Sequence, residues 1–161
     1  MAWVDGSAST SALPWSRESE DVLHHTVTCD SAVLALAVDD VRGRMLVGTQ
    51  QGDIRVWHLP TFEVQADLVG HRSSVLSLVL SDDYVFSASS DSTVRVWDAE
   101  TLQPCACVFP ASTNTGDIYS LAWDAKAQVL YMGCQDTSIE WISITRARLH
   151  EAASEPLWPT A

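Results

Sequence analysis

The sequence predicts an all-β fold made of about three repeated, four-stranded antiparallel sheets, and three observations lead to it. The stretch VGTQQGDIRVW, ending at Trp57, recurs as SASSDSTVRVW, ending at Trp97, and a third copy ends at Ile142. Within each repeat the runs are short, separated by turns, and rich in the β-branched and aromatic residues typical of strands. Several runs, such as 33–38, are apolar on both faces, which indicates a sheet packed between two others.

Each repeat is expected to form one sheet, and the units span residues 32–69, 74–109 and 117–143. The strands are expected near 32–37, 44–49, 54–58 and 63–69, then near 74–79, 84–89, 93–98 and 103–109, and finally near 117–122, 128–133 and 138–143. No stretch of the sequence is clearly recognisable as the fourth strand of the third unit. Residues 22–29 alternate in polarity and could form an outer strand of a further sheet.

The repeats are expected to occupy residues 23–144. Residues 1–22 are predicted to be an acidic flexible leader, and residues 145–161 a tail that is helical or disordered. The first twenty residues lack the basic start and apolar stretch of a secretory signal, and no apolar run is long enough to span a bilayer. A cytoplasmic protein is therefore expected.

The composition excludes several kinds of partner. The 161 residues are 47% apolar and carry a formal net charge of -12, which repels nucleic acids and anionic membranes and favours a protein partner with a basic patch. The four cysteines form no C-x-x-C pair and are expected to be buried or half-buried thiols, so no metal or other cofactor is predicted. They are Cys29, Cys105, Cys107 and Cys134.

The middle unit carries Gly70-His71 before its first strand and Trp97-Asp98 at the end of its third. This pair resembles the G-H and W-D signature of WD repeats, which form the blades of β-propellers. A closed propeller needs 4 to 8 blades. With about three blades present, the resemblance implies an incomplete propeller, and further blades in cis or in trans are expected to be needed.

The resemblance also implies a buried hydrogen-bond network in the middle unit, formed by His71, Ser89, Asp91 and Trp97. The same residue types could serve a Ser/His/Asp hydrolase, in which the histidine takes the proton of the serine. The structural interpretation is preferred because no G-x-S-x-G motif accompanies them. The sequence thus predicts no catalytic, metal or cofactor-binding residue.

The other two units depart from this pattern. The first keeps Thr49 and Trp57 but has Gln51 in place of the aspartate and Cys29 in place of the histidine. The third keeps Asp136 but has Asn114, Cys134 and Ile142 in the other places. Its Trp141 is shifted by one residue, so that it is expected to face the opposite side of the strand.

In the third unit, residues 116–122 and 133–136 look like the N-terminal propeller of the large subunit of the fungal glutathione-degrading complex. That family joins WD repeats to a zinc peptidase domain, which this sequence lacks, and works with a glutamine-amidotransferase-like subunit. The resemblance implies that such a subunit is a candidate partner.

The function predicted from these observations is a non-catalytic scaffold for protein binding, and the family resemblance implies a role in glutathione catabolism; the alternative is a hydrolase or peptidase subunit with an unrecognised site. The candidate binding residues lie where the second strand of each unit turns into the third, because loops on rigid scaffolds often carry function. They are Gln50, Ser90 and Gln135.

Overall fold

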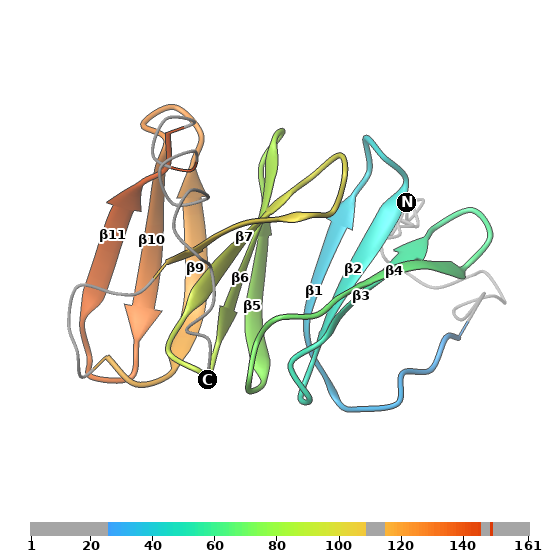
Figure 1. Ribbon diagram of the computed structural model, residues 1–161, viewed down its shortest axis with the longest axis horizontal. Helices are drawn as coiled ribbons and strands as arrows, with labels where there is room; N and C mark the ends of the chain where they lie inside the picture. The colour runs from blue at the N-terminus through green and yellow to red at the C-terminus, as the bar shows by residue number, and fades with distance from the viewer. Residues whose placement is uncertain (1–25, 109–114, 146–148, 150–161) are drawn as a thin grey trace, which may run out of the picture.

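The computed structural model describes residues 26–108, 115–145 and 149. Within these residues the chain is all-β, with eleven strands in three antiparallel sheets that stand face to face (Figure 1). The predicted fold class is therefore confirmed. The predicted leader, residues 1–22, lies outside the described residues, as does the tail apart from residues 145 and 149.

Each sheet is a simple meander in which consecutive strands are neighbours. The first sheet contains β1 (Val33–Asp39), β2 (Arg44–Thr49), β3 (Ile54–His58) and β4 (Glu63–Leu68). The middle sheet contains β5 (Val75–Leu80), β6 (Tyr84–Ser89), β7 (Val94–Asp98) and β8 (Pro104–Val108). The third sheet contains β9 (Ile118–Asp124), β10 (Val129–Cys134) and β11 (Ile139–Ser143). Residues 26–29, part of the suggested outer strand, form no strand.

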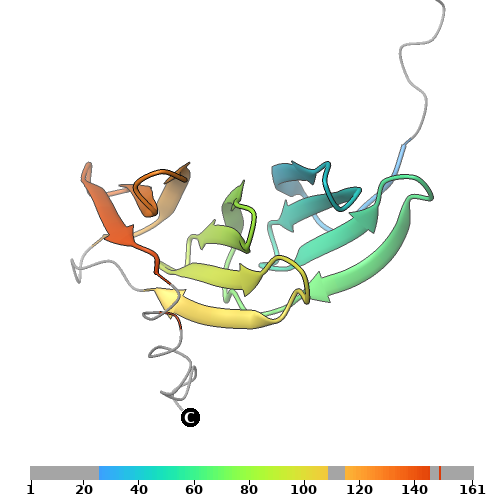
Figure 2. The same ribbon diagram turned by 90° about the horizontal axis from the view of Figure 1, so that it is seen from above.

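The three sheets form an arc (Figure 2). The inner strands β1, β5 and β9 gather on its concave side, and β1 and β9 both contact β5. The outer strands β4 and β8 lie on the convex side. Each sheet thus turns one broad face toward the preceding sheet, called here its front face, and one toward the following sheet, called its back face.

Two hydrophobic cores fill the spaces between neighbouring sheets. On β6 and β7 of the middle sheet, Val85 and Trp97 belong to the core with the first sheet, while Phe86 and Val96 belong to the core with the third. Successive side chains of a strand point to opposite faces, so a strand between two sheets must be apolar on both. This arrangement explains the continuous apolar runs of the sequence.

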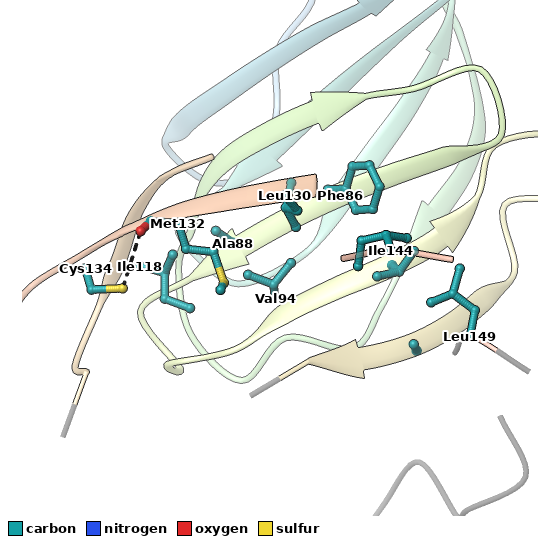
Figure 3. Close-up of a cluster of buried hydrophobic side chains, with 11 residues drawn as sticks. Phe86, Ala88, Val94, Ile118, Leu130, Met132, Cys134, Ile144 and Leu149 are labelled. Carbon is teal, nitrogen blue, oxygen red and sulfur yellow. Dashed lines mark hydrogen bonds between the residues drawn. The ribbon is translucent and has the colours of Figure 1, made fainter. Parts of the chain in front are cut away.

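The third sheet is completed differently from the other two. It has three strands within the described residues, and its core includes Ile144 and Leu149, which follow β11 (Figure 3). The main-chain N–H of Leu149 donates to the carbonyl of Thr145 at 3.1 Å. In the first sheet it is the fourth strand that supplies a core residue, Leu68. Ile144 and Leu149 therefore add apolar surface to the core between the middle and third sheets.

Candidate functional site

A chain of hydrogen bonds crosses the front face of the middle sheet. The indole Nε1 of Trp97 donates to Ser87 Oγ at 2.9 Å, and Ser87 Oγ lies 2.8 Å from Nε2 of His71. On its other side, Nδ1 of His71 lies 2.9 Å from Oδ2 of Asp91. The chain joins β7, β6, the β4–β5 connection and the β6–β7 turn, so it fixes the connection between two sheets to the middle sheet.

Asp91 ends this chain with several hydrogen bonds. Besides His71, its carboxylate accepts the main-chain N–H groups of Arg72 and Thr93 at 2.9 and 3.0 Å and the Thr93 hydroxyl at 2.6 Å. Burial by itself would raise the pKa of Asp91, but these hydrogen bonds, with that from His71 the strongest, hold it well below its usual range. Asp91 is therefore a carboxylate at neutral pH.

The serine of the network is Ser87, which corrects the assignment of Ser89. The Ser89 hydroxyl donates to the carbonyl of Ser73 at 3.0 Å and accepts the main-chain N–H of Asp91 at the same distance. Both serines lie on one face of β6, two residues apart, so the pattern alone did not choose between them. The choice follows from the register: Trp97 pairs with Val85, and its long side chain reaches Ser87, the diagonal neighbour.

The order of Ser87, His71 and Asp91 is that of a catalytic triad, but its burial prevents that use. A carboxylate only accepts, so Nδ1 of His71 donates to Asp91, and Nε2 on the other side of the ring pairs with the Ser87 hydroxyl. Ser87 and the His71 side chain are both 0% exposed. Because a substrate cannot reach a fully buried hydroxyl, this geometry supports a structural network.

The first sheet keeps the tryptophan of the network without its acceptor. By register, Trp57 pairs with Met45 as Trp97 pairs with Val85, so Val47 occupies the place of Ser87. Trp57 Nε1 and Thr49 Oγ1 are buried, and neither has a hydrogen-bond partner among the described residues. At the positions of Asp91 and His71 stand the exposed Gln51 and the half-buried Cys29.

The third sheet replaces the network with apolar side chains. Met132 occupies the place of Ser87 and Ile142 that of Trp97, and Met132 is buried in the core with the middle sheet. Asp136 forms only the hydrogen bonds within its turn: its carboxylate accepts the main-chain N–H and the hydroxyl of Ser138 at 3.0 and 2.6 Å. As expected, Trp141 lies on the opposite face, and it is 65% exposed. Asn114 is outside the described residues.

The three candidate binding residues are held by equivalent contacts. The main-chain N–H groups of Gln50, Ser90 and Gln135 donate at 2.9–3.0 Å to the carbonyls of Ala32, Ser74 and Asp117, which precede the inner strands. Two residues further along each turn the backbone has a positive φ. The residues with this φ are Gly52, Ser92 and Thr137. The three turns, called here the rim, therefore repeat one geometry.

The rim residues differ in what they offer to a partner. Gln50 and Gln135 are exposed, while Ser90 is half-buried. The Gln135 side chain is partly engaged, because its Oε1 accepts the main-chain N–H of Asp117 at 3.2 Å. The Gln50 carbonyl accepts the Ser74 hydroxyl at 2.9 Å. The rim thus presents polar side chains on a backbone that is fixed to the neighbouring inner strand.

Other kinds of site find little support within the described residues. No group of three or more His, Cys, Asp or Glu side chains there could hold a metal ion. Burial raises the pKa of Cys105, Cys107 and Cys134, so that these thiols are protonated at neutral pH. The same part of the chain contains no helix of the length and apolar character that crossing a bilayer requires.

Comparisons with known proteins agree with the repeat pattern. Residues 62–98 match the family model described as WD domain, G-beta repeat, so the chain contains a WD repeat there. Zinc finger CCCH domain-containing protein 17 of Oryza sativa subsp. japonica is 42% identical over 88 residues, which cover 52% of this chain and 19% of that protein. The probable di- and tripeptidase DUG2 of Saccharomyces cerevisiae is 27% identical over 143 residues, covering 77% and 16%.

Among solved structures, the computationally designed Ika8 protein is similar, with a TM-score of 0.61 and 29% identity over 72% of this chain and 34% of that one. The chain thus spans less than a fifth of the two natural relatives and about a third of the designed protein.

Proposed function

We propose that this chain is a non-catalytic scaffold that binds protein partners through its rim. The observation that supports the proposal is the equivalent fixing of three successive turns, each by a main-chain hydrogen bond from Gln50, Ser90 or Gln135 to the segment before an inner strand. Such turns form a row of polar groups on a rigid frame, and a partner can contact them without first ordering them.

The charge of the chain favours a partner with a basic surface. The net charge of -12 creates a negative potential that attracts cationic surfaces and speeds their encounter. Rim turns contribute acidic residues of their own, among them Asp53 and Asp136. Binding is therefore expected to weaken as salt screens these charges.

The test compares two variants that add the same charge. One changes Gln50, Ser90 and Gln135 to Arg, and the other changes Gln65, Gln103 and Ala125 to Arg, which are exposed and lie away from the rim. Quantitative pull-downs should find proteins retained by the wild type and by the second variant but lost by the first. Equal retention by both variants would place the binding surface elsewhere.

Within this function, we propose that the chain acts in glutathione catabolism with a glutamine-amidotransferase-like subunit. The proposal is supported by the sequence of the third unit and by the 27% identity with the yeast di- and tripeptidase across 77% of this chain. A purified subunit of that type should be retained by the wild-type chain and released by the rim variant. No retention by the wild type would reject this partner and leave the scaffold proposal to the first test.

A further inference from the structure

A cavity of about 250 Å³, called here the aromatic cavity, opens between the middle and third sheets. It lies between the β5–β6 turn and the β9–β10 turn, and its lining includes Leu80, Asp82, Asp83, Tyr84 and Trp123. The rim turn follows the last residue of β6, whereas this cavity lies at the start of β6, at the opposite end of the strand. The two sheets that form it pack against each other through a shared core, so the cavity belongs to an interface inside the chain.

Two aromatic rings form much of the apolar lining. Tyr84 lies on β6 and Trp123 on β9, and both are half-buried. Both rings pack against the fully buried Phe86, with ring centroids 6.2 Å apart for Tyr84 and 5.0 Å apart for Trp123. The core therefore holds the two rings in place and leaves part of each open. An open aromatic face attracts cations through its negative quadrupole.

Two carboxylates lie beside these rings. Asp82 and Asp83 are exposed, and each is bonded through its main chain: the carbonyl of Asp82 accepts from Arg42 at 2.8 Å, and that of Asp83 accepts from the N–H of Ala99 at 2.9 Å. In the part of the chain that the structure describes, neither carboxylate forms a hydrogen bond or an ion pair. The cavity thus combines aromatic faces with two negative charges that no cation of the described chain neutralises.

The neighbouring cavity shows that this combination is specific. It has a volume of about 330 Å³ and lies on the other side of the β5–β6 turn, so that Asp82 lines both cavities. Asp40 lines only the neighbouring cavity, and so does Arg42, which is paired with Asp39 and Glu100. None of the residues described in that lining is aromatic. The aromatic cavity is therefore the better site for a cation.

The turns that bound the aromatic cavity are held by internal hydrogen bonds. The Ser81 hydroxyl accepts the main-chain N–H of Tyr84 at 2.9 Å, and the Ser81 N–H donates to the Tyr84 carbonyl at 2.8 Å. In the opposite turn the Asp124 carboxylate accepts the main-chain N–H groups of Lys126 and Ala127, both at 2.9 Å. A ligand therefore meets walls that are already ordered, which favours its binding.

We propose that the aromatic cavity binds a basic side chain, lysine or arginine, of a partner protein. The aliphatic stem of such a side chain packs against Leu80 and the two rings, and its charged head lies between the rings and the carboxylates of Asp82 and Asp83. The negative potential of the chain favours the approach of a basic partner. Because this site lies at the opposite end of the strands from the rim, it is independent of the proposed rim function.

The experiment is an NMR titration of the 161-residue chain that follows the indole N–H of Trp123. The spectrum of Trp123→Phe assigns this signal among those of the other tryptophans. The probes are the blocked tripeptides acetyl-Ala-Lys-Ala-amide and acetyl-Ala-Arg-Ala-amide, and the control is acetyl-Ala-norleucine-Ala-amide, which has an apolar stem without the charge. At least one basic peptide should shift the signal to saturation, and the control should leave it unchanged.

Three variants, each verified by circular dichroism to be folded, locate the binding. Asp83→Asn should weaken binding of the basic peptide about two- to fivefold, because it removes a carboxylate from the lining. Tyr84→Leu should weaken it by a similar factor, because it keeps an apolar side chain but removes a ring. The matched control is Asp40→Asn, which removes the same charge from an exposed residue of the neighbouring cavity and should leave the Kd unchanged.

Three outcomes would overturn the proposal. If neither basic peptide gives a saturable shift, the cavity does not take a basic side chain. If the norleucine peptide shifts the signal as much as the basic peptides do, the cavity recognises only apolar surface. Equal weakening by Asp83→Asn and Asp40→Asn would mean that the peptide responds to the net charge of the chain and not to this cavity.

Discussion

The middle and first sheets contain the same tryptophan in different surroundings. Trp97 is 2% exposed and Trp57 is 8% exposed, so both contribute a large buried surface. Trp97 donates to Ser87, but Trp57 has Val47 beside it, and its N–H has no partner in the part of the chain that the structure describes. An unpaired buried donor costs about 1 to 3 kcal/mol. The first sheet therefore gains the packing of the indole without the hydrogen bond that offsets its desolvation.

The third sheet shows the apolar solution to the same problem. Ile142 and Met132 replace the tryptophan and the serine together, so no polar group is left there to be satisfied. Replacing both members of a buried polar pair by apolar groups can be nearly neutral, whereas replacing one is costly. The network residues therefore act as a set, and the following changes test this view.

The largest effect is expected from Ser87→Ala, which gives the middle sheet the defect of the first. It leaves Trp97 Nε1 and His71 Nε2 without their shared partner in a fully buried place, at about 1 to 3 kcal/mol for each group. Urea denaturation would measure the loss. Ser90→Ala is the control because the Ser90 hydroxyl is outside the chain of bonds, and equal losses in the two variants would contradict the role of Ser87.

Asp91→Ala should cost about 1 to 3 kcal/mol in total. The change removes the acceptor for His71, Thr93 and the Arg72 main chain, but this end of the network is nearer the surface, and water can replace part of what is lost. The control is Asp136→Ala, which disturbs only a turn, and its effect on the denaturation midpoint should be smaller. Unchanged midpoints for Asp91→Ala would mean that the network does not stabilise the fold.

The advantage of Asp91 over asparagine should depend on pH. The pKa of Asp91 is depressed in the folded chain, so its contribution is complete above the unfolded value of about 3.9 and is lost as the pH falls through the folded value. The stability difference between wild type and Asp91→Asn should be constant near neutral pH and shrink below about pH 4. Thermal melts across this range measure it, and a difference that grows toward acid would contradict the assignment.

The smallest effect is expected from Val47→Thr, which offers the unpaired indole of the first sheet an acceptor. The hydroxyl can accept from Trp57, so we expect the stability to stay within about 1 kcal/mol of the wild type. Val56→Thr places the same hydroxyl in the apolar core on the other face of the sheet and should cost about 1 to 3 kcal/mol. If both changes cost the same, Trp57 does not use the hydroxyl.

The positions of the strands were predictable because they depend on local signals. The expected ranges agree with β1–β11 within two residues at every end, since runs of β-branched and aromatic residues end at turns such as Ser81–Asp83. The alternation also predicted that Trp141 lies on the opposite face from Ile142. His71, Asp91 and Trp97 were identified from their place in the repeat.

Two features could not be predicted in the same way. One is which of Ser87 and Ser89 joins the network, and the other is that Trp57 has no acceptor beside it. Both serines lie on one face of one strand, and only the distances across the sheet show which of them reaches His71 and Trp97. Likewise, Val47 is an ordinary strand residue until the register places it beside Trp57. These are contacts between segments far apart in the sequence.

The sequence by itself determined the repeat, the strand boundaries and the alternation of faces, because these depend on side-chain shape and polarity over a few neighbouring residues. The tertiary structure alone decided which face is covered and by what. Ile54, Val94 and Ile139 occupy equivalent places on their strands, yet the first two are fully buried and the third is 70% exposed. Burial depends on whether another sheet lies opposite, and no local pattern contains that information.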